Sequence, residues 1–354
     1  MKRMLLPLLG GIVLLASGCN KQMDMTATTK APEIQAVRTE AGAETGELKL
    51  PESYDLIMTL GAETSSTYAM GIQIGEYFNE TAPQIRCTVK AGAAGSNIEL
   101  ANAGQTVISH TQSDLIHAAL AGTGSFTEKK ENFSGVATVM ESVFHLAVSE
   151  DAPVNTLEEI IEQKYPLKIS VGAQGSGIES LFRKILQSYG VTYEDIESWG
   201  GRIEFLSMSE AATLFKDDQL NAVTILAGVP YSGITEVATA RNIKFIGISD
   251  QVKEALLNEG YMEKTIPAGS YKGQDEDVNS IGVSISVIAS NTADEAVIYE
   301  ITKFLNSPEG IQKLSDVNSG YANYMKGPET GVAGMECELH PGARRYYEEA
   351  GVLK

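Results

Sequence analysis

The sequence predicts an α/β fold with parallel strands, and three observations support this prediction. Short apolar strand patterns run repeatedly through polar or glycine-rich loops into segments whose apolar residues recur at helical spacing. Such alternation is typical of parallel sheets with helices on their faces. Apolar residues make up 43% of the chain, which is enough for a sizeable core. The roughly 300 residues after the N-terminal segments are too many for one core and suit two lobes of about 150 residues each.

The N-terminus has the pattern of a secretory signal. A basic start precedes an apolar run over residues 5–16, which is too short to span a bilayer. The segment Leu15-Ala-Ser-Gly-Cys19 also resembles a bacterial lipoprotein box, which implies that Cys19 is lipidated and holds the protein to a membrane surface. We therefore expect a lipoprotein signal peptide over residues 1–18; an ordinary signal peptide that happens to contain a cysteine is the alternative. Residues 19–50 show no apolar period and are expected to form a flexible tether to an extracytoplasmic domain.

Three strand-to-helix junctions are expected early in this domain. Met70, Ile74 and Phe78 mark one face of the first helix, and Ser113 is a candidate cap for the third. Ligands of open parallel sheets bind beyond the carboxyl ends of the strands, where the connecting loops of these junctions lie. The strand patterns cover residues 54–60, 85–89 and 107–111, and the loops cover residues 61–67, 92–97 and 112–114.

Two further junctions follow. Residues 169–179 run from a strand through a glycine loop into a helix, whose unpaired N–H groups and dipole could hold a carboxylate without any Arg or Lys. Ser176 could cap that helix or contact the anion itself. The alternative is that this loop binds nothing, as holds for most glycine-rich turns of α/β proteins. The strand pattern at residues 221–226 leads to Pro230, which suits the first turn of a helix.

Two long strand patterns, residues 137–148 and 281–289, stand apart from these junctions. We expect them to pair and to act as hinge strands between the lobes, with a ligand cleft between the lobes. One lobe would comprise residues 51–143 and 286–354, and the other residues 144–285. Helices are expected at residues 293–305, 308–317 and 341–350.

Composition and spacing exclude several functions. The net charge is −19, or −21 once Lys2 and Arg3 leave with the signal, which excludes nucleic acid as a partner. The four histidines show no metal-ligand spacing, and no nucleophile elbow, phosphate-binding loop or dinucleotide fingerprint is present. We therefore predict no enzyme activity, no cofactor and no metal site. Cys87 and Cys337 could form a disulfide or remain two free thiols.

Several segments together resemble the TAXI family, the TRAP-transporter-associated extracytoplasmic immunogenic solute receptors. The resemblance implies a two-lobed type II periplasmic binding protein with parallel-rich sheets, hinge strands and an interlobe ligand cleft. The matching segments together span residues 55–351, and their number and order carry the resemblance. The matching segments are Thr67-Tyr68, Ala94-Gly-Ser-Asn-Ile-Glu-Leu100, Gln112-Ser-Asp114, Ser170-Val-Gly-Ala-Gln-Gly-Ser-Gly177, Ala227-Gly-Val-Pro230, Ile266-Pro-Ala-Gly-Ser-Tyr271 with residues 272–275, and His340-Pro-Gly-Ala343.

The resemblance implies capture of a small carboxylate or amino acid, such as glutamate, glutamine or a dicarboxylate, and its delivery to the membrane subunits of a TRAP-type importer. A binding lipoprotein of the same fold that serves an ABC importer or a membrane sensor is the alternative, as is a surface lipoprotein without a transport role. Tyr231 could stack on the ligand or only wall the cleft. The expected ligand-binding residues are Thr64, Ser66, Thr67, Tyr68, Ser96, Asn97, Gln112, Gln174, Gly175, Ser176, Gly177 and Tyr231.

The first loop departs from the family pattern. Similar proteins carry a glycine-rich loop there, whereas this chain has Glu63, Ser65 and Ser66. A carboxylate at position 63 would repel a second ligand carboxylate and attract a ligand ammonium, so Glu63 could favour an amino acid. It could equally be a solvated loop residue.

Overall fold

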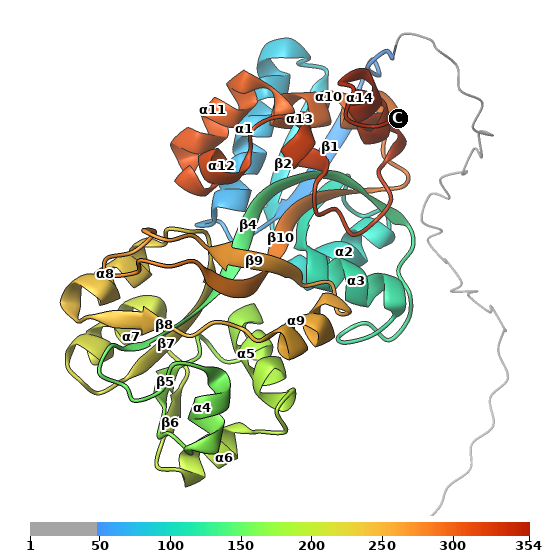
Figure 1. The fold of residues 1–354 in the computed structure, drawn as a ribbon. Coiled ribbons are helices and arrows are strands. Elements are labelled where there is room, and N and C mark those ends of the chain that lie inside the picture. Colours follow the sequence, from blue (N-terminus) through green and yellow to red (C-terminus); the bar gives the residue numbers. More distant parts are fainter. Residues whose placement is uncertain (1–47) are drawn as a thin grey trace, which may run out of the picture. The chain divides into compact units, whose positions relative to one another are not determined.

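A ten-stranded mixed sheet runs through residues 48–354, the part of the chain that the computed structural model describes (Figure 1). The expected signal peptide, the lipidation site Cys19 and nearly all of the tether lie outside these residues. None of the described helices is long and apolar enough to cross a membrane. The strand order is β2 (Ile85–Ala91), β1 (Tyr54–Leu60), β3 (Ile108–Gln112), β10 (Val278–Ser290), β4 (Phe133–Ser149), β7 (Ala222–Ala227), β5 (Lys168–Ser170) and β6 (Arg202–Glu204), while β8 (Ile243–Phe245) pairs with β4 and β9 (Met262–Ile266) pairs with β10.

The predicted α/β alternation is confirmed at both ends of the sheet. Strand β1 pairs in parallel with β2 and β3, and β5 pairs in parallel with β6 and β7. All five predicted junctions lead from a strand into a helix. These helices are α1 (Ser66–Thr81), α2 (Ala94–Asn102), α3 (Ser113–Ala121), α5 (Gly177–Gln187) and α8 (Ser232–Ala240).

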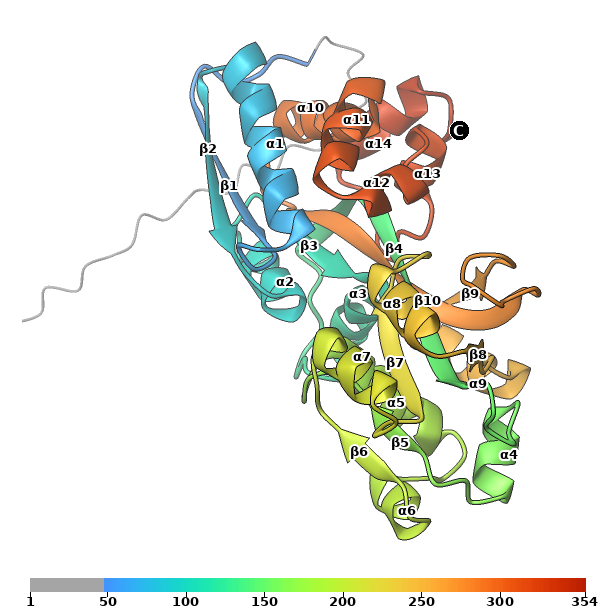
Figure 2. The same ribbon diagram turned by 90° about the vertical axis from the view of Figure 1, so that its left-hand side faces the viewer.

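The two long strands, which were expected to pair as hinge strands, join these ends into one sheet. Strands β4 and β10 are antiparallel to each other; β10 is also antiparallel to β3, and β4 to β7. Register shifts between Ile285 and Ser286 and between Val287 and Ile288 interrupt the β4–β10 pairing, and such bulges increase the local twist. Figure 2 shows β4 and β10 running between the blue and teal elements of the first part and the yellow-green elements of the second part.

Two local predictions about helix starts were wrong. Ser113 is the first residue of α3, so its hydroxyl does not cap the helix; its Oγ instead accepts the N–H of Ser284 on β10 at 3.2 Å. Pro230 lies outside α8, because that helix starts at Ser232 with Tyr231 as its N-cap residue. In contrast, Ser176 does cap α5, with its Oγ accepting the N–H of Glu179 at 3.4 Å.

Short elements complete the fold, and most of them were not predicted. Three-residue strands and six-residue helices are too short to show an apolar period. The three expected C-terminal helices are present as α10 (Glu295–Asn306), α11 (Pro308–Val317) and α14 (Pro341–Glu349). The other helices are α4 (Leu157–Glu162), α6 (Tyr193–Ser198), α7 (Met208–Lys216), α9 (Asp250–Leu257), α12 (Ser319–Tyr324) and α13 (Pro328–Val332).

The core follows the predicted apolar faces. Met70, Ile74 and Phe78 of α1 are fully buried against the sheet. Cys87 and Cys337 are free thiols, so the disulfide alternative is excluded. Burial raises the pKa of Cys87 to about 11 and that of Cys337 to about 12, which makes both thiols unreactive near neutral pH.

Candidate functional site

The first three junctions form one hydrogen-bonded cluster. The N–H of Gly92 donates to Gly61 O at 3.4 Å, which joins the loops after β1 and β2. Asn97 is fully buried, and its Nδ2 donates to His110 O at 2.9 Å and to Leu60 O at 3.5 Å. Thr111 Oγ1 donates to Ala94 O at 3.1 Å. The start of α2 is therefore held against the ends of β1 and β3.

Gln112 brings this cluster to the fourth junction. A Cβ atom placed on Gly177 would lie 3.8 Å from Gln112 Oε1, so the end of β3 approaches the first turn of α5. Two of the residues predicted for one site, from distant parts of the sequence, are thus neighbours in space.

Helix α12 links the first junction to the fifth. Tyr321 is buried, and its hydroxyl donates to Ser66 O at 3.0 Å. Asn323 Nδ2 donates to Val229 O, in the loop between β7 and α8, at 3.4 Å. The sequence prediction did not include α12, because its six residues carry no motif and only the tertiary fold brings it here. We call the five junctions and α12 the junction cluster.

The twelve predicted ligand residues differ in exposure. Buried Thr67 has its Oγ1 3.1 Å from Ser65 Oγ, and Asn97 is committed to the backbone contacts described above. Because these two side chains are engaged inside the protein, their first role is to hold the fold and not to contact a solute. The exposed residues are Thr64, Ser96, Gln174, Gly175 and Gly177, while Ser66, Tyr68, Gln112, Ser176 and Tyr231 are half-buried.

The helices of the junction cluster have an unusual charge pattern. The first turns of α1, α2, α8 and α12 contain no acidic residue. Most described helices elsewhere, namely α4, α6, α7, α9, α10, α11 and α13, carry an acid in the first turn. An acid there compensates the positive end of the helix dipole. The N-termini of α1, α2 and α8 therefore carry a partial positive charge that no acid in their first turns compensates, which favours an anionic group.

Helices α3 and α5 of the junction cluster do carry an acid in the first turn, Asp114 and Glu179 respectively. In α5, Glu179 is buried, and its Oε2 accepts the N–H of Gly175 at 3.3 Å. Its Oε1 pairs with Arg183 at 2.6 Å. Because this carboxylate already occupies the N-terminal end of α5, the loop of residues 172–177 offers a weaker anion site than its glycines suggest. We expect neutral contacts from Gln174 and Ser176 there.

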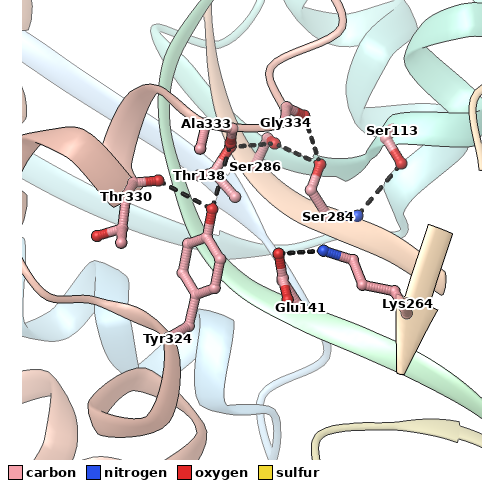
Figure 3. A network of polar contacts seen from close by, with 10 residues as sticks. All are labelled: Ser113, Thr138, Glu141, Lys264, Ser284, Ser286, Tyr324, Thr330, Ala333 and Gly334. Carbon is pink, nitrogen blue, oxygen red and sulfur yellow. Dashed lines mark hydrogen bonds and ion pairs between the residues drawn. The ribbon is translucent and has the colours of Figure 1, made fainter. Parts of the chain in front are cut away.

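A second polar network lies where β4 and β10 run together (Figure 3). Glu141 of β4 forms an ion pair with Lys264 of β9. The hydroxyl of Ser284 donates to Gly334 O at 2.9 Å, and the Tyr324 hydroxyl donates to Thr330 O at 2.9 Å. The Ser284 contact ties the C-terminal segment to β10, the ion pair joins β4 to β9, and the Tyr324 bond lies within the C-terminal segment.

A cavity of about 480 Å³ shares no lining residue with the junction cluster. It is lined by β8, by residues 247–249 and 273–279, and by the start of α4. Four acids and Lys244 border it, and Lys244 is engaged with Ala152 O and Asn155 Oδ1. Within residues 48–354, no three His, Cys, Asp or Glu side chains are arranged to hold a metal ion.

Comparison with known proteins gives a family and several distant structural relatives. The model of the NMT1-like family matches residues 58–351. The TctC solute binding protein from Polaromonas is 14% identical, with 85% of this chain and 99% of that chain covered and a TM-score of 0.46. The aliphatic sulphonate binding protein SsuA from Escherichia coli is 14% identical, with coverages of 78% and 79% and a TM-score of 0.42. A phosphate transport receptor from Vibrio cholerae is 14% identical, with coverages of 75% and 98% and a TM-score of 0.43. Because these identities and TM-scores are low, the ligand of none of these proteins can be assigned to this chain.

Proposed function

The chain belongs to the NMT1-like family, and we propose that it is an extracytoplasmic solute-binding lipoprotein that captures a small carboxylate or amino acid for a TRAP-type importer. The observation that carries this proposal is the junction cluster. Five strand-to-helix junctions from distant parts of the sequence are linked by contacts, and the helices α1, α2 and α8 present uncompensated N-termini.

The side chains of the cluster suit binding without turnover. The predicted contacts are hydroxyls, amides, tyrosines and glycine N–H groups, which offer neutral hydrogen bonds. Helix N-termini add the preference for an anion without a cationic side chain. No nucleophile beside a general base is found among these residues, so the arrangement holds a solute and does not transform it.

The central strands suit two lobes that move about a hinge. We propose residues 51–143 and 286–354 as one lobe and residues 144–285 as the other, with β4 and β10 as the connection. In support, β3 and β7 contact different parts of this strand pair: β3 pairs with Ile285–Ala289 and β7 with Val143–Val148. Closure of such lobes would enclose a solute at the junction cluster.

A ligand screen tests the binding proposal. Residues 48–354, which form one compact unit, are unfolded and refolded to remove bound solute. They are then titrated calorimetrically with L-glutamate, L-glutamine, 2-oxoglutarate and succinate. Saturable binding of one of these compounds supports the proposal, and its absence with all carboxylates and amino acids rejects the ligand class.

Anchoring is tested separately in cells. The Cys19→Ser variant of the full chain should move from the membrane fraction to the soluble extracytoplasmic fraction, because the proposed acyl chains would be missing. Retention of this variant in the membrane fraction would reject the lipid anchor and leave the binding proposal untouched.

A further inference from the structure

A buried hydrogen-bond chain connects central strand β4 to the loop between β7 and α8. The N–H of Tyr231 donates to the hydroxyl of Tyr271 at 2.8 Å. That hydroxyl lies 2.9 Å from His145 Nε2, and His145 Nδ1 lies 2.8 Å from Val143 O. His145 is fully buried, and Tyr271 is 5% exposed.

The partners fix the direction of every hydrogen bond in this chain. Val143 O can only accept, so Nδ1 of His145 carries the proton. Nε2 of the neutral imidazole is then the acceptor, and the Tyr271 hydroxyl donates to it. The same hydroxyl has a lone pair left for the N–H of Tyr231. The Tyr271 hydroxyl therefore serves both the Tyr231 N–H and His145 Nε2, and its loss leaves both without this partner.

Packing holds the two side chains that form this chain. The rings of His145 and Tyr271 meet edge to face, with centroids 5.6 Å apart. Phe245 of β8 contacts both rings, at centroid distances of 6.0 Å from His145 and 5.2 Å from Tyr271. Although Tyr271 lies in the loop between β9 and β10, its ring is thus packed on two sides where it presents the hydroxyl to Tyr231.

The position of Tyr231 gives this chain a role beyond stability. Tyr231 is the N-cap residue of α8, and its side chain makes no capping hydrogen bond. Its backbone direction therefore sets where the first N–H groups of α8 point. We propose that Tyr271 and His145 are positioning residues that hold the N-terminus of α8 and the side chain of Tyr231 in the orientation that binds solute. This inference rests on the proposed function of the junction cluster.

Hydrogen exchange tests the positioning role without a ligand. In Tyr271→Phe the ring remains while the hydroxyl is lost, so we expect the Tyr231 amide to exchange at least tenfold faster. Tyr347→Phe is the matched control, because the buried Tyr347 hydroxyl also joins two partners, Val136 O and Asn306 Nδ2, in another part of the core. Equal exchange of the Tyr231 amide in the two variants, measured by mass spectrometry with amides of α10 as the internal reference, would overturn the proposal.

Two substitutions of His145 separate hydrogen bonding from packing. Gln can place an amide oxygen near the former Nε2 position, whereas Leu offers no acceptor. We expect His145→Gln to restore slow exchange at Tyr231 and His145→Leu to resemble Tyr271→Phe. Fast exchange in both variants, or slow exchange in both, would contradict a role that depends on the acceptor.

Calorimetry with L-glutamate, L-glutamine, 2-oxoglutarate and succinate extends the test to binding. For the compound that the wild type binds, Tyr271→Phe should raise Kd at least tenfold, and Tyr347→Phe should leave it within about twofold. If the wild type binds one of these compounds and Tyr271→Phe binds it with the same Kd, the positioning role is rejected and the proposed function stands. If the wild type binds none of the four, the proposed function fails, and the exchange data still decide whether this chain positions the loop.

Discussion

Acid should destabilise this protein through its buried histidines, and His145 is one of them. Burial lowers the pKa of His145 from 6.5 to about 4. In the unfolded chain the imidazole takes up a proton below pH 6.5, whereas in the folded chain it stays neutral until about pH 4. Its contribution to stability is therefore complete above pH 6.5 and is lost as the pH falls toward 4.

The size of this effect follows from the difference between the pKa of His145 in the unfolded and in the folded chain. A difference of about 2.5 pKa units corresponds to about 3.4 kcal/mol in full, of which about 2 kcal/mol is lost between pH 7 and pH 5. Urea titrations at both pH values, followed through the fluorescence of the single tryptophan, Trp199, measure the free energy of unfolding. The His145→Gln variant has no titrating group at position 145. Between pH 7 and pH 5 its free energy of unfolding should therefore fall by about 2 kcal/mol less than that of the wild type. Equal losses in the two proteins would refute the assignment of a neutral buried imidazole.

Three further predictions concern the junction cluster and the central strands. Gln112→Ala should weaken solute binding at least tenfold, about 1.4 kcal/mol, while the urea midpoint stays close to that of the wild type; an unchanged Kd in calorimetry would remove Gln112 from the site. Asn97→Ala should lower the free energy of unfolding by about 2 kcal/mol, because two buried carbonyls lose their donor; a urea titration that shows less than about 0.5 kcal/mol would contradict its framework role. Lys264→Met should cost about 1–3 kcal/mol, because Glu141 then keeps a half-buried charge without a partner. Adding Glu141→Gln should recover part of that loss in the same assay, and no recovery would argue against the ion pair.

The strand-to-helix junctions could be predicted because their signals are local. Alternating apolar residues, glycine turns and helical spacing all lie within about 15 residues of each other. The buried face of α1 and the capping of α5 by Ser176 follow from such signals. The same reasoning was wrong for Ser113, because the partner of its hydroxyl, Ser284, is 171 positions away in the sequence.

The rest of the site depends on contacts between distant segments. Nothing near Gln112 in the sequence indicates that it approaches Gly177, and nothing near Tyr321 indicates its bond to the Ser66 carbonyl. The pairing of β4 with β10 was expected as a hinge, but neither its antiparallel direction nor the continuous sheet that it creates could be read from the sequence. The carboxylate of Glu179 at the N-terminus of α5 was visible in sequence, but its bond to the Gly175 N–H required the folded loop.

The proposed function requires that helix N-termini in the junction cluster select a carboxylate. Calorimetry on refolded residues 48–354 can compare L-glutamate with its α-amide, and succinate with succinamide, which differ in charge while keeping similar shape. We expect saturable binding of at least one carboxylate and at least tenfold weaker binding of the matched amide. Equal or tighter binding of the amide, or no binding by either pair, would contradict the proposed function.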